Sequence, residues 1–129
     1  MTIGQMIEQV DTLRPNEWAE AVKRKWLSDC EQMIINEVIL THEGNESDRE
    51  KAALFDGYNM LTSEDTLLII QSPHDDVYRW YLEMQVALAN NEHDAFTDAV
   101  TMYNQCYQTL RAQYNEKYMP VANARRFKI

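Results

Sequence analysis

The fold of this chain is decided by residues 73–120, whose sequence is PHDDVYRWYLEMQVALANNEHDAFTDAVTMYNQCYQTLRAQYNEKYMP. In the second half of this stretch, large residues recur in steps of three and four, which places them on one side of an α-helix. They are Phe96, Val100, Tyr103, Tyr107, Leu110 and Tyr114. The first half repeats the pattern with Val77, Tyr81, Met84 and Leu88, widened by Tyr78, Trp80 and Ala87. Two amphipathic helices joined by a short polar break, residues 90–92, are predicted to pack antiparallel.

Length and composition favour a single helical domain. The chain has 129 residues, enough for one hydrophobic core, and only three glycines and three prolines, too few for the turns of an all-β domain. No window approaches the run of about 18 apolar residues that spans a bilayer. The first residues lack the basic start and apolar run of a secretory signal. The sequence therefore predicts a non-membrane, cytoplasmic protein.

Charge is distributed unevenly along the chain. The net charge is −9, and residues 1–100 hold 20 of the 21 acids. The last thirteen residues carry four bases, Lys117, Arg125, Arg126 and Lys128. An acidic body argues against wrapping nucleic acid, which needs clustered Lys and Arg. The short basic end is better suited to docking on an acidic neighbour, such as another copy of this chain.

Two further helices are predicted before the hairpin. Thr2 is expected to cap a first helix whose buried face is Ile3, Met6, Ile7 and Val10, ended before Pro15. Asn16 is expected to cap a second helix from Glu17 to about Thr41. Its predicted inward face is Trp18, Val22, Trp26, Cys30, Met33 and Glu37 or Val38, broadened by Leu27, Ile34, Ile35 and Ile39. Apolar residues on both sides of its second half predict that it is covered on two faces.

The remaining segments lack a helical period. Residues 42–63 begin as a polar, charged loop, and residues 66–70 are a β-prone run that forms a short strand or an extended arm. A strand there would need a partner from residues 54–61 or from a neighbouring subunit. Residues 121–129 are either an extended, subunit-crossing tail or a frayed terminus. The overall prediction is an all-α bundle of about four helices over residues 1–120, with at most a short β segment, followed by the tail.

Two histidines were weighed as metal ligands. His42 lies beside Glu43, and His74 precedes Asp75 and Asp76, but neither group has the spacing of a metal site. The stronger interpretation is a helix start at residues 72–76, with Ser72 or His74 near the cap and two acids in the first turn. His93 and Asp94 are expected to begin the next helix in the same way. No metal or cofactor is predicted.

No catalytic residue is predicted either. Cys30 and Cys106 fall within predicted helices, away from any CxxC pattern, and are interpreted as reduced, buried thiols. The chain has no GxSxG, no phosphate-binding glycine loop and no GxGxxG. Tyr103, Tyr107 and Tyr114 lie on the core stripe, which favours packing over stacking on a cofactor or a base. The sequence therefore predicts a protein that is not an enzyme.

Several short segments of the chain resemble segments found in one protein family. They are residues 10–16 (VDTLRPN), 25–28 (KWLS), 37–39 (EVI), 41–42 (TH), 73–78 (PHDDVY), 81–82 (YL) with Gln85, 89–92 (ANNE), 114–115 (YN) and 119–120 (MP). The chain resembles the head–tail connector (adaptor, or head-completion) proteins of tailed phages and prophages of Gram-positive bacteria. The likeness runs from about Ile3 to Pro120 and consists of packing and capping phrases, with no catalytic signature.

The resemblance implies a structural virion protein of the phage neck. Members of this family are helical proteins that assemble as a ring, typically of twelve copies, below the portal protein. Such a ring extends the DNA channel without specific DNA binding and seats the next neck or tail protein. By this resemblance, residues 42–72 are candidates for a loop facing the channel or an adjacent ring, and residues 121–129 for an arm docking on the portal or on a neighbour. Two alternatives are another neck component, such as a tail-completion protein or tail assembly chaperone, and a small regulatory interaction module of a mobile element.

Overall fold

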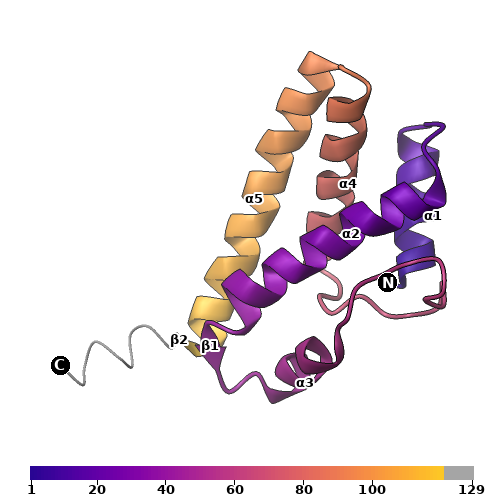
Figure 1. The fold of residues 1–129 in the computed structure, drawn as a ribbon. Coiled ribbons are helices and arrows are strands. Elements are labelled where there is room, and N and C mark those ends of the chain that lie inside the picture. Colours follow the sequence, from indigo (N-terminus) through magenta and orange to yellow (C-terminus); the bar gives the residue numbers. More distant parts are fainter. Residues whose placement is uncertain (121–129) are drawn as a thin grey trace.

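A computed structural model describes residues 1–120 of the chain, and residues 121–129, including the whole predicted tail, lie outside the described part (Figure 1). The predicted all-α class is confirmed. The elements are α1 (Ile3–Leu13), α2 (Glu20–Ile34), the π-helical turn η1 (Ile35–Ile39), β1 (His42–Glu43), α3 (Glu46–Leu54), α4 (Asp76–Ala89), α5 (His93–Lys117) and β2 (Met119–Pro120). No helix within residues 1–120 combines the length and the apolar content needed to cross a bilayer.

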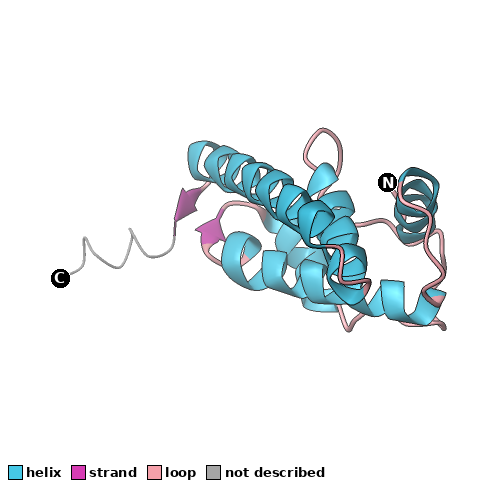
Figure 2. Cartoon of the chain, turned by 90° about the horizontal axis from the view of Figure 1, so that it is seen from above, coloured by secondary structure: helices cyan, strands magenta, loops and turns pink. Residues whose placement is uncertain are grey.

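The predicted hairpin is present as α4 and α5, which lie side by side and antiparallel (Figures 1 and 2). The chain reverses at residues 90–92, where Asn91 takes a left-handed conformation with φ of 58°. Along α5, Tyr103, Leu110 and Tyr114 are buried as predicted, and the other three residues of the stripe are half-buried. Periodicity alone was therefore sufficient to place both helices.

The buried face of α4 differs from the prediction. Leu88, expected to point inward, is 54% exposed. Leu82 and Val86, which lie outside the predicted face, are fully buried together with the predicted Val77, Tyr78 and Ala87. The reason is that α4 is covered on two sides, by α5 and by the pair α1 and α2. Tyr81 faces α5, where its ring lies 5.6 Å from that of Tyr103, and Tyr78 faces α2.

The first helix, α1, begins and packs as predicted. The Thr2 hydroxyl accepts a hydrogen bond from the Gln5 backbone N–H, and the Gln5 side chain accepts from the Thr2 N–H, which completes a capping box. All four residues of the predicted inner face are buried. Helix α1 therefore closes the end of the core that α2 and α4 leave open.

The second helix starts later than predicted. Helix α2 begins at Glu20 after an Ala19 cap that makes no side-chain hydrogen bond, so the prediction of an Asn16 cap was wrong. Asn16 instead secures the turn between α1 and α2: its carbonyl oxygen accepts from the Trp18 N–H, and its amide donates to Asp11. The local sequence favoured a cap, but the turn uses the same side chain to join two helices.

The buried face of α2 is rotated from the predicted one. Trp18, Val22, Trp26 and Met33 are only half-buried, whereas Lys23, Arg24 and Glu31 are buried together with the predicted Leu27, Cys30 and Ile34. The Lys23 ammonium lies 2.8 Å from Asp11 of α1 and is thereby paired. The helix ends in the π-helical turn η1, which still buries Ile35, Val38 and Ile39.

The segment predicted as an irregular loop contains a helix, α3. No residue of α3 is buried, so its sequence carries no apolar stripe from which a helix could be predicted. Side-chain contacts hold it instead. The Arg49 guanidinium donates to the backbone carbonyls of Leu40 and His42, and the Tyr114 hydroxyl of α5 donates to Asp48.

The β-prone run at residues 66–70 is an extended segment that pairs with the N-terminus of the same chain. Thr2 and Leu67 form an isolated antiparallel bridge, and the Ile3 N–H donates to the Thr66 carbonyl at 2.9 Å. Residues 54–61, one of the partners predicted for a strand, do not pair with it. Pairing with a neighbouring subunit stays a prediction. The nearby start of α4 also differs: it begins at Asp76, one acid rather than two lies in its first turn, and its cap, Asp75, makes no side-chain hydrogen bond.

The described chain ends in a two-stranded antiparallel sheet. In β1 and β2, His42 pairs with Pro120 and Glu43 with Met119. Helix α5 ends at Lys117, as expected for a chain that reaches Pro120 three residues later. This pairing fixes the point from which the chain leaves the described structure.

Candidate functional site

The most distinctive part of the described chain is the segment of residues 55–75 between α3 and α4, which we call the arm (Figure 1). It contains no regular secondary structure of its own. Irregular segments of this length are uncommon in compact domains and are usually functional. The question is therefore what holds the arm in place and what it presents to solvent.

A buried arginine holds the outer turn of the arm. Arg24 of α2 is only 4% exposed, and its Nη1 donates to the carbonyl oxygens of Asn59 and Thr62 at 2.8 and 2.6 Å. The same guanidinium lies 3.3 Å from the Glu20 carboxylate one helical turn earlier. A planar guanidinium can satisfy several acceptors at once, which a lysine at this position could not do with the same geometry.

A buried carboxylate holds the base of the arm. Glu31 of α2 is fully buried, and its Oε2 accepts from the Tyr58 hydroxyl at 2.8 Å and from the Ile69 N–H at 3.2 Å. Its Oε1 accepts from the Tyr78 hydroxyl at 2.7 Å, and that hydroxyl in turn accepts from the Ile70 N–H. Glu31 thus connects α2, both ends of the arm and α4.

Burial dominates the electrostatics of this cluster. Loss of water around Glu31 raises the pKa of its carboxyl above the ordinary value of 4.5, against the lowering effect of the three hydrogen bonds. The pKa values of the Tyr58 and Tyr78 hydroxyls are also raised, first by burial and then by the neighbouring carboxylate. Both tyrosines therefore keep their protons and donate them to Glu31 in hydrogen bonds, and the Tyr78 oxygen also accepts from the Ile70 N–H.

A glycine lets the arm approach α2 closely. Gly57 has φ of 99°, a conformation that residues with a side chain rarely adopt, and an added Cβ would lie 3.3 Å from Ser28 Oγ. The next residue, Tyr58, donates its N–H to the same Ser28 oxygen. The sequence thus places glycine where the chain turns against the helix.

The outer side of the arm presents apolar side chains to solvent. The four residues of this apolar surface are Leu54, at the end of α3, and Met60, Leu61 and Leu67, with exposed fractions of 79%, 56%, 96% and 58%. A groove of about 260 Å³ runs between the end of α3 and the arm and is lined by Leu54, Phe55, Tyr58, Leu67 and their neighbours. Large apolar side chains held outside a core are typical of protein–protein contacts.

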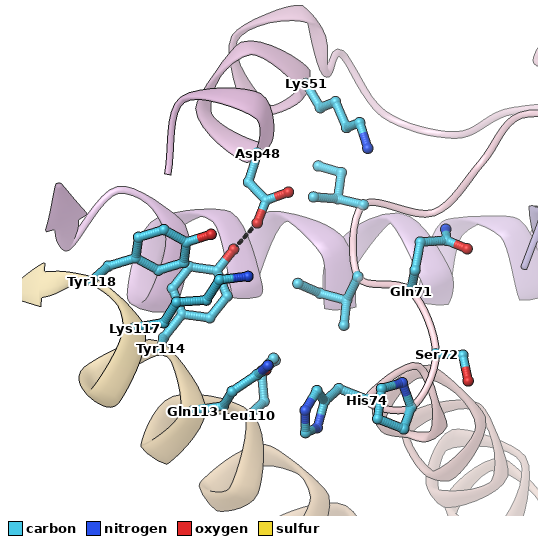
Figure 3. A pocket seen from close by; sticks show the side chains of 13 residues that line it. Asp48, Lys51, Gln71, Ser72, His74, Leu110, Gln113, Tyr114, Lys117 and Tyr118 are labelled. Atoms are coloured by element: carbon cyan, nitrogen blue, oxygen red, sulfur yellow. Dashed lines mark hydrogen bonds between the residues drawn. The ribbon is translucent and has the colours of Figure 1, made fainter. Parts of the chain in front are cut away.

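A polar hollow lies on the other side of the arm, between α3, the arm and α5 (Figure 3). Its volume is about 220 Å³, and its polar lining includes Asp48, Lys51, Gln71, His74 and Lys117. Figure 3 shows the Tyr114 hydroxyl donating to Asp48 across one side of the hollow. Tyr114 has a raised pKa because of burial and this carboxylate, so its hydroxyl stays protonated.

The two histidines weighed from the sequence lie apart and have different surroundings. His42 is buried; its Nδ1 donates to the Val38 carbonyl at 2.6 Å, and its Nε2 lies 2.8 Å from the Asn115 side-chain amide. His74 lines the polar hollow. Within residues 1–120, no three His, Cys, Asp or Glu side chains come together in a group that could hold a metal ion.

The cysteines are free thiols. Cys30 is fully buried, and burial raises its pKa well above the ordinary value of 9.0; Cys106 is half-buried, with its pKa raised for the same reason. A thiol needs the opposite shift to act as a nucleophile at neutral pH. The geometry around both cysteines therefore suits packing.

None of three comparisons, with models of protein families, with curated proteins and with solved structures, found a match to this chain. The site is therefore interpreted from its own residues. Its central members, Arg24, Glu31 and Tyr58, were not singled out from the sequence. The available signal was Glu31 itself, an acid spaced four residues after Leu27 and three before Ile34, in line with the apolar stripe of α2.

Proposed function

We propose that this chain is a structural virion protein, a head–tail connector that assembles as a ring below the portal protein of a tailed phage. In this role it extends the DNA channel and seats the next neck protein. The resemblance of the sequence to phage connector proteins is the reason for proposing a phage particle. The observation of the structure that supports assembly is the arm: a long segment fixed by buried Arg24 and Glu31 that presents exposed leucines to solvent.

The way the arm is held favours a binding role over a reacting one. The strongest polar cluster of the described chain, around Glu31, is fully buried, and each of its donors is already matched to the carboxylate. No polar group of this cluster is left to act on a substrate. What the cluster achieves is a fixed shape for the arm, and a preformed surface loses little conformational freedom on binding.

The charge of the chain also fits a channel protein. The whole chain has a net charge of −9 and its acids all lie before residue 117, so the body repels the phosphates of a passing duplex and raises the energetic cost of contact. The body has one run of bases, residues 23–25, and Lys23 and Arg24 of that run are buried. Four of the twelve bases of the sequence lie after residue 116.

The test is assembly with the portal protein that the proposal requires in the same phage genome. We expect the mixture to form rings that sit on the portal and are visible by electron microscopy, with several copies of the chain per portal by native mass spectrometry. The chain alone at the same concentration is the control, because rings of this kind often form only on their template. A chain that stays small and binds a tail protein would favour an assembly chaperone, and one that binds neither would contradict the proposal.

A further inference from the structure

The described chain ends at β2, beside β1, where Lys117 and Tyr118 line the same polar hollow as residues 69–74 of the arm. From α3, the outer turn of the arm runs toward the N-terminus (Figure 1). Nine residues, 121–129, follow β2. At roughly 3.3–3.6 Å per residue, nine residues span at most about 30 Å. They are long enough to reach an adjacent copy in an assembly.

The composition of residues 121–129 complements that of the arm region. The segment VANARRFKI carries three bases and no acidic side chain, and it contains two large apolar residues, Phe127 and Ile129. Residues 43–66, which include α3 and most of the arm, carry seven acids and two bases. Asp56, Glu64 and Asp65 of this region are exposed. Opposite charges of this kind steer association and fix its register.

The groove beside the arm offers an apolar seat. It has a volume of about 260 Å³ and is lined mostly by apolar groups, with Asp56 and Lys51 at its border. An apolar cavity of about 150 Å³ is known to hold a benzene molecule, so a phenylalanine ring fits the space. Leu54 and Leu67 border the groove and are 79% and 58% exposed, leaving area that an occupant would cover.

We propose that residues 121–129 of one copy dock in the groove between α3 and the arm of the next copy. Phe127 or Ile129 enters the groove, and the neighbouring arginines pair with Asp56, Glu64 and Asp65. Because the donated segment and the receiving groove are different surfaces, the contact is head-to-tail, and repeated contacts of this type close a ring when the rotation permits. This inference rests on the proposed ring and identifies the contact between its subunits.

The experiment uses the full chain with a photo-crosslinking amino acid in place of Phe127. Equal amounts of isotopically light and heavy chains are mixed, assembled on the portal protein and irradiated, and crosslinked peptides are identified by mass spectrometry. We expect mixed light–heavy products joining position 127 to residues 54–67. The matched control carries the same crosslinker in place of Leu88, which is exposed in the last turn of α4, next to the break that joins α4 to α5.

A charge-reversal series tests the ionic part of the contact. Replacing Arg125→Glu and Arg126→Glu together is expected to lower the mixed crosslink yield at least tenfold, and Asp56→Lys with Asp65→Lys in the same chain is expected to restore most of it. Crosslinks only within one chain, or only to the portal, would overturn the docking while rings on the portal still upheld the proposed function. If no ring forms, both ideas fail.

Discussion

Replacing Glu31→Ala is expected to lower the free energy of unfolding by about 3 kcal/mol, the largest stability loss that we predict for any side chain of the site. The substitution leaves three buried donors, the hydroxyls of Tyr58 and Tyr78 and the Ile69 N–H, without their acceptor. Each unmatched donor costs roughly 1–3 kcal/mol, partly offset because a buried carboxylate is no longer desolvated. Urea denaturation followed by circular dichroism measures the difference.

Glu31→Gln is the matched control. Glutamine keeps the shape of the side chain and one acceptor oxygen, so the Tyr58 hydroxyl and the Ile69 N–H retain a partner. We expect a loss of about 1 kcal/mol, the typical net value of one hydrogen bond. If the alanine and glutamine variants were equally stable, the carboxylate would not be what fastens the arm.

The raised pKa of Glu31 gives this cluster a pH dependence with a definite sign. Between the unfolded value, near 4.5, and the higher folded value, the folded chain holds a proton that the unfolded chain has released. The stability contributed by this group is therefore fully present below the unfolded pKa and is lost as pH rises through the folded pKa. The stability advantage of the unsubstituted chain over Glu31→Gln should accordingly shrink on going from acid to neutral pH.

Replacing Leu61→Asp is expected to abolish assembly without harming the fold. Leu61 is 96% exposed, so the free energy of unfolding should change by no more than about 0.5 kcal/mol. Burying a leucine at an interface is worth roughly 1.5–3 kcal/mol, and an unpaired carboxylate there adds a desolvation cost. Because each copy in a ring has two neighbours, we expect the concentration needed for assembly to rise about a hundredfold or more.

The matched control for this experiment is Leu88→Asp, a leucine that is 54% exposed and lies in the last turn of α4. Assembly is followed by analytical ultracentrifugation with and without portal protein. Unchanged assembly of the Leu61 variant, or equal loss in both variants, would mean that the arm is not the contacting surface.

The helices with a strong period could be located from the sequence, because apolar residues that recur every three or four positions are typical of a helix. The α4–α5 hairpin and α1, with its Thr2 cap, are of this kind, whereas the buried face of α4 also depends on the elements that cover it. Helix α3 could not be predicted, since it buries none of its residues and depends on Arg49 and Asp48 contacting distant elements. The same applies to the rotated face of α2, which is set by the arm and α4 packing on it.

The cluster around Glu31 that fixes the arm could not be predicted from neighbouring residues in the sequence. A single glutamate in a helix is ordinarily expected to be exposed to solvent. Its burial is energetically tolerated only when hydrogen-bond donors surround the carboxylate. The donors to Glu31 come from Tyr58, Ile69 and Tyr78, which are 27 to 47 residues away in the chain. Only the folded topology brings these groups together.

Hydrogen exchange of residues 59–70, measured by mass spectrometry in the free chain and in the portal-bound assembly, tests the central claim most directly. If the arm is held in place before assembly, the backbone amides of Ile69 and Ile70, which are hydrogen-bonded, should already exchange slowly in the free chain. Protection of residues 60–67 should then rise further in the assembly. Exchange at the rate of an unstructured peptide in the free chain, or identical exchange in both states, would contradict the account.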